Sequence, residues 1–178
     1  MMFNQDVFIE QLVKRQKSGK DYLFIGLYIL AFLLLLLVIF IFIQYLIFFA
    51  LLIVAGAAWG LYTLITNRNL EFEYICTNGH VDIDTIYNKR KRKRKVSMSS
   101  KNMEILAPVS DPAFRKYSED KSYKTLDCTS NTGDANVWFF TGKYKDNMVL
   151  VLFEPESRII EDCKRFNPRV VKFNPIQG

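Results

Sequence analysis

The chain has 178 residues, half of them apolar, and a formal net charge of +6. No charged residue occurs between Tyr22 and Ile65, whereas both flanks are rich in charge. This division excludes a conventional soluble globular protein, because a long uncharged apolar run is typical of a membrane segment. About 110 residues follow the run, which is enough for one small domain but not for two.

The N-terminal segment, residues 1–21, is predicted to be an amphipathic juxtamembrane helix. Asn4 can cap it, and apolar residues recur at helical spacing from Val7 to Val13. Such a helix lies either on the membrane surface, leading into the first span, or against the soluble domain. The sequence leaves both placements open.

Residues 22–65 are predicted to form a hairpin of two transmembrane helices. One straight helix of this length would measure about 66 Å, about twice the roughly 30 Å of the hydrocarbon core. The natural halves are Tyr22–Phe42 and Leu46–Ile65, with a turn near Gln44. Lys and Arg flank the outer ends and none lies in the turn, so the positive-inside rule predicts a multi-pass cell-membrane protein with both termini in the cytosol.

The second half of this segment contains Gly56 and Gly60 in G-x-x-x-G spacing. This motif lets helices approach closely, either within the hairpin or between copies. No ionisable residue lies inside the apolar run, which disfavours a transporter or a channel.

The soluble part, residues 66–178, changes to the alternating period of β-strands. Strands are predicted on both sides of Asn78-Gly79, a hairpin turn signal, and again over 137–144 and 148–153. A short strand is expected near 124–129, and residues 113–117 form either a short helix or part of a loop. Pro155 then opens an amphipathic helix that Asn167-Pro168 ends.

These elements predict a mainly-β (α+β) cytosolic domain. It would be a small curved antiparallel sheet or barrel whose open side is covered by the C-terminal helix. The order of two membrane helices, antiparallel strands and a last helix resembles bacterial membrane proteins with pleckstrin-homology-like domains. The stretches Asp6–Arg15, Thr77–Lys95 and Met103–Pro108 also resemble an uncharacterised membrane-protein family of clostridia and their relatives, which implies no activity.

The most distinctive motif is an uninterrupted basic run that supplies the candidate lipid-binding residues. Each Lys or Arg near an anionic leaflet contributes roughly 1 kcal/mol. The run is predicted to hold the domain against acidic headgroups, or else to protect an exposed sheet edge or be neutralised by nearby acids. Nucleic acid is disfavoured because no aromatic residue interrupts the run. Its members are Lys89, Arg90, Lys91, Arg92, Lys93, Arg94 and Lys95.

No catalytic motif, metal site or cofactor site is predicted. Asp82 and Asp84 share one strand face and are expected to pair with Lys or Arg across the sheet. His80, the single histidine, is expected to be an exposed turn residue, and one imidazole builds neither a triad nor a metal site. The three cysteines are far apart in sequence and are expected to be reduced thiols.

The sequence therefore predicts a membrane-anchored, non-enzymatic binding or scaffold module. Its partners would be the lipid bilayer, acidic headgroups or an unknown protein. The alternative is an accessory subunit of a membrane enzyme or transport complex that docks through its helices.

Overall fold

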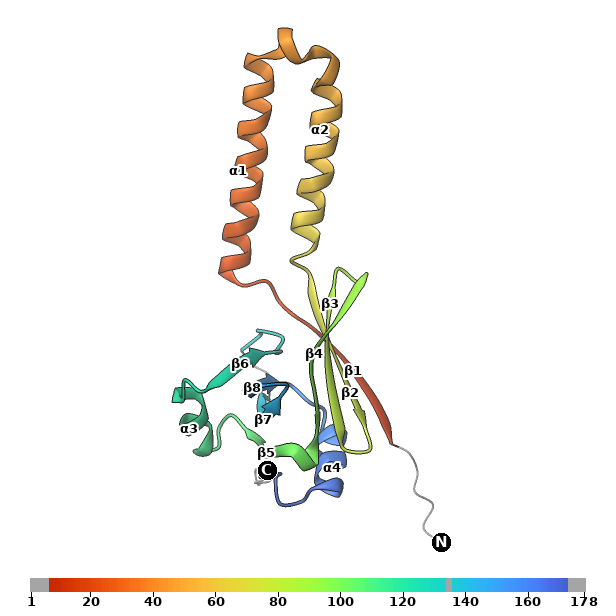
Figure 1. Cartoon of the computed structure of the whole chain (residues 1–178), viewed down its shortest axis with the longest axis vertical. Coiled ribbons are helices and arrows are strands. Elements are labelled where there is room, and N and C mark those ends of the chain that lie inside the picture. The colour runs from red at the N-terminus through yellow and green to blue at the C-terminus, as the bar shows by residue number, and fades with distance from the viewer. Residues whose placement is uncertain (1–6, 134–135, 173–178) are drawn as a thin grey trace.

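The computed structural model describes residues 7–133 and 136–172. Figure 1 shows a long helical hairpin standing on a β-rich part, with the last helix at the end far from the hairpin. The order of elements is β1, α1, α2, β2–β4, a short 3-10 turn at Ser100–Asn102, β5, α3, β6–β8 and α4.

The hairpin consists of α1, Gly19–Ile41, and α2, Ile43–Thr66. Ser18 and Asp21 form a capping box at the start of α1. The break falls at Phe42, close to the expected turn and without Gly or Pro. Both helices are long and apolar enough to cross a membrane, judged by length and composition.

The predicted N-terminal helix is wrong where the structure describes it. Phe8–Lys14 is a strand, β1, paired antiparallel with β2, Leu70–Thr77. The apolar residues fit helical spacing in isolation, but Ile9 and Val13 share one face of a strand and are buried in the core. Pairing with β2 satisfies the backbone of this segment, which decides in favour of a strand. The predicted cap, Asn4, lies outside the described residues.

The helical hairpin is an insertion between two paired strands. Lys14 lies opposite Glu71 in the β1–β2 ladder, and the N–H of Arg15 donates to the carbonyl of Leu70 at 3.0 Å. The chain therefore leaves the sheet at the end of β1 and returns to the neighbouring position at the start of β2. The β-rich part includes β1 as well as the residues after 66.

The first sheet has the order β1-β2-β3-β4, with β3 at His80–Tyr87 and β4 at Lys91–Ser99. All its neighbours are antiparallel. The predicted turn at Asn78-Gly79 is confirmed, with φ of 50° and 74° at the two residues.

The second sheet has the order β5-β7-β8-β6. The expected strands over 137–144 and 148–153 are confirmed as β7, Trp138–Tyr144, and β8, Asn147–Phe153. The purely antiparallel prediction is wrong at β6, because β6 runs parallel to β8. Its direction is set by α3, which crosses from β5 and packs Phe114 and Tyr117 against the sheet. The other elements are β5 at Met103–Pro108, α3 at Ala113–Glu119 and β6 at Tyr123–Asp127.

The core lies between the two sheets and is closed by α4, Ser157–Phe166. Tyr74 and Phe153 meet edge to face with ring centroids 5.7 Å apart. Ile159 and Cys163 of α4 are fully buried against these strands. The predicted role of the last helix as a cover is therefore confirmed.

Candidate functional site

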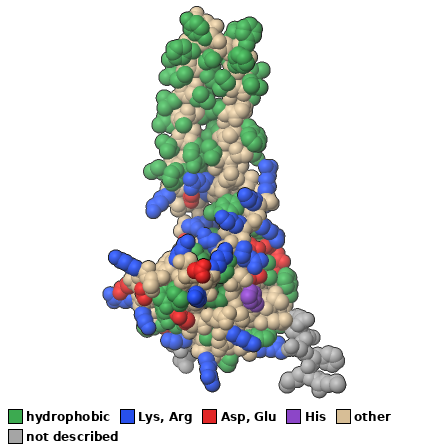
Figure 2. Space-filling model, in the orientation of Figure 1, with side chains coloured by type: hydrophobic (Ala, Val, Ile, Leu, Met, Phe, Trp, Pro, Cys, Tyr) green, Lys and Arg blue, Asp and Glu red, His purple; other side chains and the backbone are tan. Residues whose placement is uncertain are grey.

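The basic run occupies the β3–β4 turn and most of β4, at one edge of the first sheet. The turn uses left-handed backbone at Asn88 and Lys89, with φ of 47° and 56°. The N–H of Asn88 donates to the carbonyl of Asn69 at 2.9 Å, which fixes the turn beside the segment that follows α2. Figure 1 shows this turn pointing toward the end of α2. Figure 2 shows Lys and Arg side chains gathered just below the apolar hairpin.

Alternation along β4 divides the run into two sets. Arg92 and Arg94 point to the outer face of the sheet, away from the core, where carboxylates of β2 and β3 lie. Arg94 binds both predicted aspartates: its Nη1 is 2.6 Å from Asp82 Oδ2, and its Nε donates to Asp84 Oδ1. The expected cross-strand pairing of the aspartates is confirmed.

The other five members of the run are Lys89, Arg90, Lys91, Lys93 and Lys95. Among the described residues, no carboxylate lies within ion-pair distance of any of them. Lys95 is the extra residue of a β-bulge, since Asp84 pairs with Arg94 and Ile83 with Val96. These five side chains therefore keep their positive charge available to a ligand.

A cavity of about 400 Å³ lies between the β3–β4 hairpin and the end of α2. Lys91 and Lys93 line it from β4, and Arg90 lines it from the turn. Thr66 and Asn67 line the opposite wall, where the helix ends. A cavity lined by three basic side chains thus lies at the level where the apolar surface of the helical hairpin stops.

The foot of the hairpin is held by Arg68, which lies between α2 and β2. Its Nη1 is 3.4 Å from Asp21 Oδ1, and its Nη2 donates to the hydroxyl of Tyr28 at 3.0 Å. The guanidinium also lies over the ring of Phe24, 4.5 Å from its centroid. One side chain therefore ties the end of α2 to the first turns of α1.

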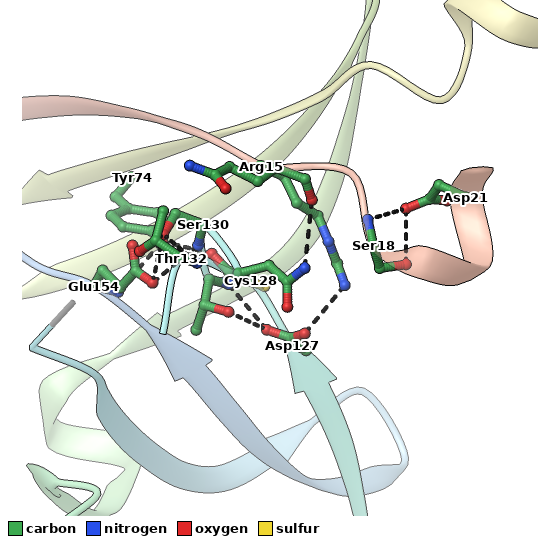
Figure 3. Close-up of polar contacts among 12 residues, drawn as sticks. Arg15, Ser18, Asp21, Tyr74, Asp127, Cys128, Ser130, Thr132 and Glu154 are labelled. Carbon is green, nitrogen blue, oxygen red and sulfur yellow. Dashed lines mark hydrogen bonds and ion pairs between the residues drawn. The ribbon is translucent and has the colours of Figure 1, made fainter. Parts of the chain in front are cut away.

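A second set of contacts ties the β1–α1 connection to the β6–β7 loop (Figure 3). Arg15 Nη2 lies 3.2 Å from Asp127 Oδ2, and the N–H of Gln16 donates to the carbonyl of Ser130 at 2.7 Å. Ser130 in turn donates from its N–H to Glu154 Oε1 at 2.9 Å. These bonds link the start of the hairpin to the second sheet, so the hairpin is attached to both sheets.

The outer face of the first sheet holds a buried carboxylate that the sequence analysis missed. Glu73 on β2 has no exposed surface, and Arg92 Nη2 lies 2.8 Å from its Oε1. Neither oxygen has a hydrogen bond in the described part of the chain. Burial raises the pKa of Glu73, and the Glu10 carboxyl raises it further, while Arg92 lowers it. Its place in the alternation with Phe72 and Tyr74 was the available signal.

Gly56 and Gly60 do not mediate contact between the two helices of the hairpin. A Cβ added at either position would meet no atom within 4 Å in the described structure. Whether this face contacts another helix stays a prediction.

The other residues weighed from the sequence are not assembled into a reaction centre. Within residues 7–133 and 136–172, no group of His, Cys, Asp and Glu could hold a metal ion. His80 is exposed and lies 2.9 Å from Ser97 Oγ and 3.3 Å from Asp82 Oδ1. All three cysteines are free and buried.

A family model described as "Bacterial PH-like domain (DUF6106)" matches residues 5–173. The chain belongs to this family. The matched span covers β1, the helical hairpin and both sheets. PH-like domains are generally binding or scaffold modules rather than enzymes. Among curated proteins and solved structures, no significant match was found. The clostridial and membrane-protein parts of the resemblance stay predictions.

Proposed function

We propose that this PH-like protein spans the membrane twice and presents a non-enzymatic binding module to acidic lipid headgroups. The observation that supports this is a set of five basic side chains without ion pairs among the described residues, of which Arg90, Lys91 and Lys93 line the cavity beside the end of α2. Net attraction to an anionic leaflet requires charge that the protein has not already neutralised. The predicted lipid-docking role of the basic run is thereby narrowed to Lys89, Arg90, Lys91, Lys93 and Lys95.

The pairing of β1 with β2 supports two crossings of the membrane. Lys14 and Glu71 are neighbours in one ladder, so both must be on the same side of any bilayer. The intervening chain can then cross only an even number of times, and its two apolar helices supply two crossings. The excess of Lys and Arg at the foot of the hairpin favours the cytosolic side.

A resonance-energy-transfer experiment on the full chain tests the proposal. Since the native thiols are buried, a fluorophore can be attached to a single introduced cysteine, K101C, on the exposed 3-10 turn. The protein is placed in nanodiscs that contain acceptor-labelled phosphatidylglycerol or acceptor-labelled phosphatidylcholine. We expect stronger transfer to the acidic lipid, and a decrease of this preference as salt is added.

A matched pair of variants locates the effect. Replacing Lys89, Lys91, Lys93 and Lys95 by Gln should abolish the preference for acidic lipid. Replacing four exposed lysines of α3, the α3–β6 connection and the second sheet removes the same charge and should preserve the preference: Lys116, Lys121, Lys124 and Lys143. Equal transfer to both lipids in the parent protein would overturn the proposal.

The accessory-subunit alternative is favoured by one observation, the open space around Gly56 and Gly60. Small residues on an uncovered helix face leave room for a partner helix. Purification of the chain in mild detergent distinguishes the two functions: a stoichiometric integral membrane partner that is lost in G56L/G60L supports the accessory role.

A further inference from the structure

Glu73, on the outer face of the first sheet, competes with any external anion for one cation of the basic run. Arg92 belongs to the basic run, and its side chain is 62% exposed. Its guanidinium nevertheless turns away from the foot of the hairpin and reaches over β3 to Glu73 on β2. The carboxylate therefore withholds one cation of the run from any ligand of β4.

We infer that Glu73 is a proton-sensitive latch on Arg92, and that protonation of Glu73 releases the arginine toward acidic headgroups. The inference rests on the proposed function and adds its regulation. The bound state is the ionised Glu73 with Arg92 at 2.8 Å. The released state is the neutral carboxylic acid, which no longer attracts the guanidinium.

Burial destabilises the ionised form of Glu73. A fully buried carboxylate without hydrogen bonds keeps its charge only through its ionic partner. Asp84, by contrast, is bound to Arg94 through hydrogen bonds from both Nε and Nη2. Protonation of Glu73 therefore removes the ionic partner of Arg92 and leaves the contacts of Arg94 with Asp82 and Asp84 in place.

Neighbouring carboxylates also favour protonation of Glu73. Glu10 on β1 and Asp84 on β3 add negative charge, which favours the neutral form, and Glu71 on β2 lines the cavity beside it. Arg92 on β4 opposes them, and Lys89 and Arg90 line the same cavity of about 450 Å³ from the turn. This cavity borders Glu73 and gives protons a short route to it from solvent.

The membrane setting makes such a latch useful. The negative potential of an acidic leaflet attracts protons as well as basic side chains. A domain that approaches the leaflet enters a more acidic layer, and Glu73 becomes neutral there. Release of Arg92 then adds one positive charge to the docking surface at the place where it is needed.

The test follows transfer from the K101C fluorophore to labelled phosphatidylglycerol in the full chain as the pH is lowered from neutral. The parent protein should show a rise in apparent affinity of up to about five-fold, the effect of one basic side chain near the leaflet. Glu73→Gln mimics the protonated residue. Its apparent affinity should already be high at neutral pH and should not rise further as the pH is lowered. His80→Gln, at the other end of the face, should retain the rise.

A second variant keeps the test decisive even if Glu73→Gln fails to fold. Arg92→Gln removes the released charge at an exposed position, so its transfer should stay low at every pH. A rise that persists in Glu73→Gln or in Arg92→Gln would overturn the latch. A parent protein that prefers phosphatidylglycerol at every pH equally would also overturn it while leaving the proposed function intact. No preference at any pH would overturn the proposed function itself.

Discussion

The N–H of Arg15 donates to the carbonyl of Leu70 at 3.0 Å, although the entire helical hairpin lies between them in the chain. The hairpin therefore occupies the position of a loop in a β-hairpin. Its two ends are held together by the sheet below and by Arg68 across the helices. The helices and the β1–β2 ladder are therefore joined at both ends of the insertion.

The first prediction concerns how the soluble part can be isolated. Replacing residues 18–68 by a short Gly/Ser linker should give a soluble, cooperatively folded domain, because β1 and β2 already end side by side. A fragment that begins at Asn67 lacks β1 and loses the burial of Ile9 and Val13, worth about 1.5–3 kcal/mol each. Urea unfolding of the two proteins compares them directly. Equal stability would show that β1 is dispensable.

The second prediction uses two glycines that share a left-handed backbone. Gly79→Ala should destabilise by about 2–4 kcal/mol, since its φ is 74° and the new Cβ would lie 2.6 Å from Phe166 Cβ. Gly133→Ala has a φ of 78° but open space, so only the backbone term of about 1 kcal/mol is expected. Thermal unfolding in detergent measures both. Similar losses would mean that α4 does not pack on the β2–β3 turn as described.

The third prediction separates the two sets of cations in the basic run. Arg94→Gln should lower the free energy of unfolding by about 1 kcal/mol, because Asp82 and Asp84 lose their shared partner. Lys93→Gln removes the neighbouring charge, which has no described ion pair, and should leave stability unchanged. Chemical denaturation at neutral pH tests the contrast, and a stability loss in Lys93→Gln would contradict the division of the run.

The fourth prediction concerns thiol reactivity. Burial raises the pKa of Cys128 to about 12, and the pKa of Cys76 is also raised, chiefly by its contact with Cys163 and by burial. Raised pKa values lower the thiolate fraction, and the thiolate is the reactive form. At mildly alkaline pH the native protein should therefore resist iodoacetamide, whereas the unfolded chain should be alkylated at all three positions. Mass spectrometry of each state gives the result.

Local signals in the sequence account for much of the fold. The Asn78-Gly79 turn, the aromatic strands before and after Lys145, and the stripe ending at Phe166 are each encoded within a few residues. The hairpin follows from the length of the uncharged run. These features need no knowledge of distant partners.

What the sequence could not provide depends on pairing between distant segments. Residues 8–14 satisfy helical spacing, and only β2, beyond the hairpin, makes them a strand. The parallel direction of β6 depends on α3 and β8 in the same way. The sequence predicts the basic run as one patch. Its division into paired arginines and unpaired cations depends on the carboxylates of β2 and β3 that lie beside β4. The burial of Glu73 likewise depends on residues far along the chain, among them Arg92 on β4.

The insertion of the hairpin between β1 and β2 also sets an order of events during synthesis. Strand β1 leaves the ribosome first, but its partner follows only after both helices have been made. Until the helices have folded back to one side, β1 has no ladder to join, and one edge of β2 stays unpaired. If the hairpin inserts into a membrane as proposed, the first sheet closes only on chains with the correct topology, and wrongly inserted chains would present an unpaired apolar strand to proteases and chaperones.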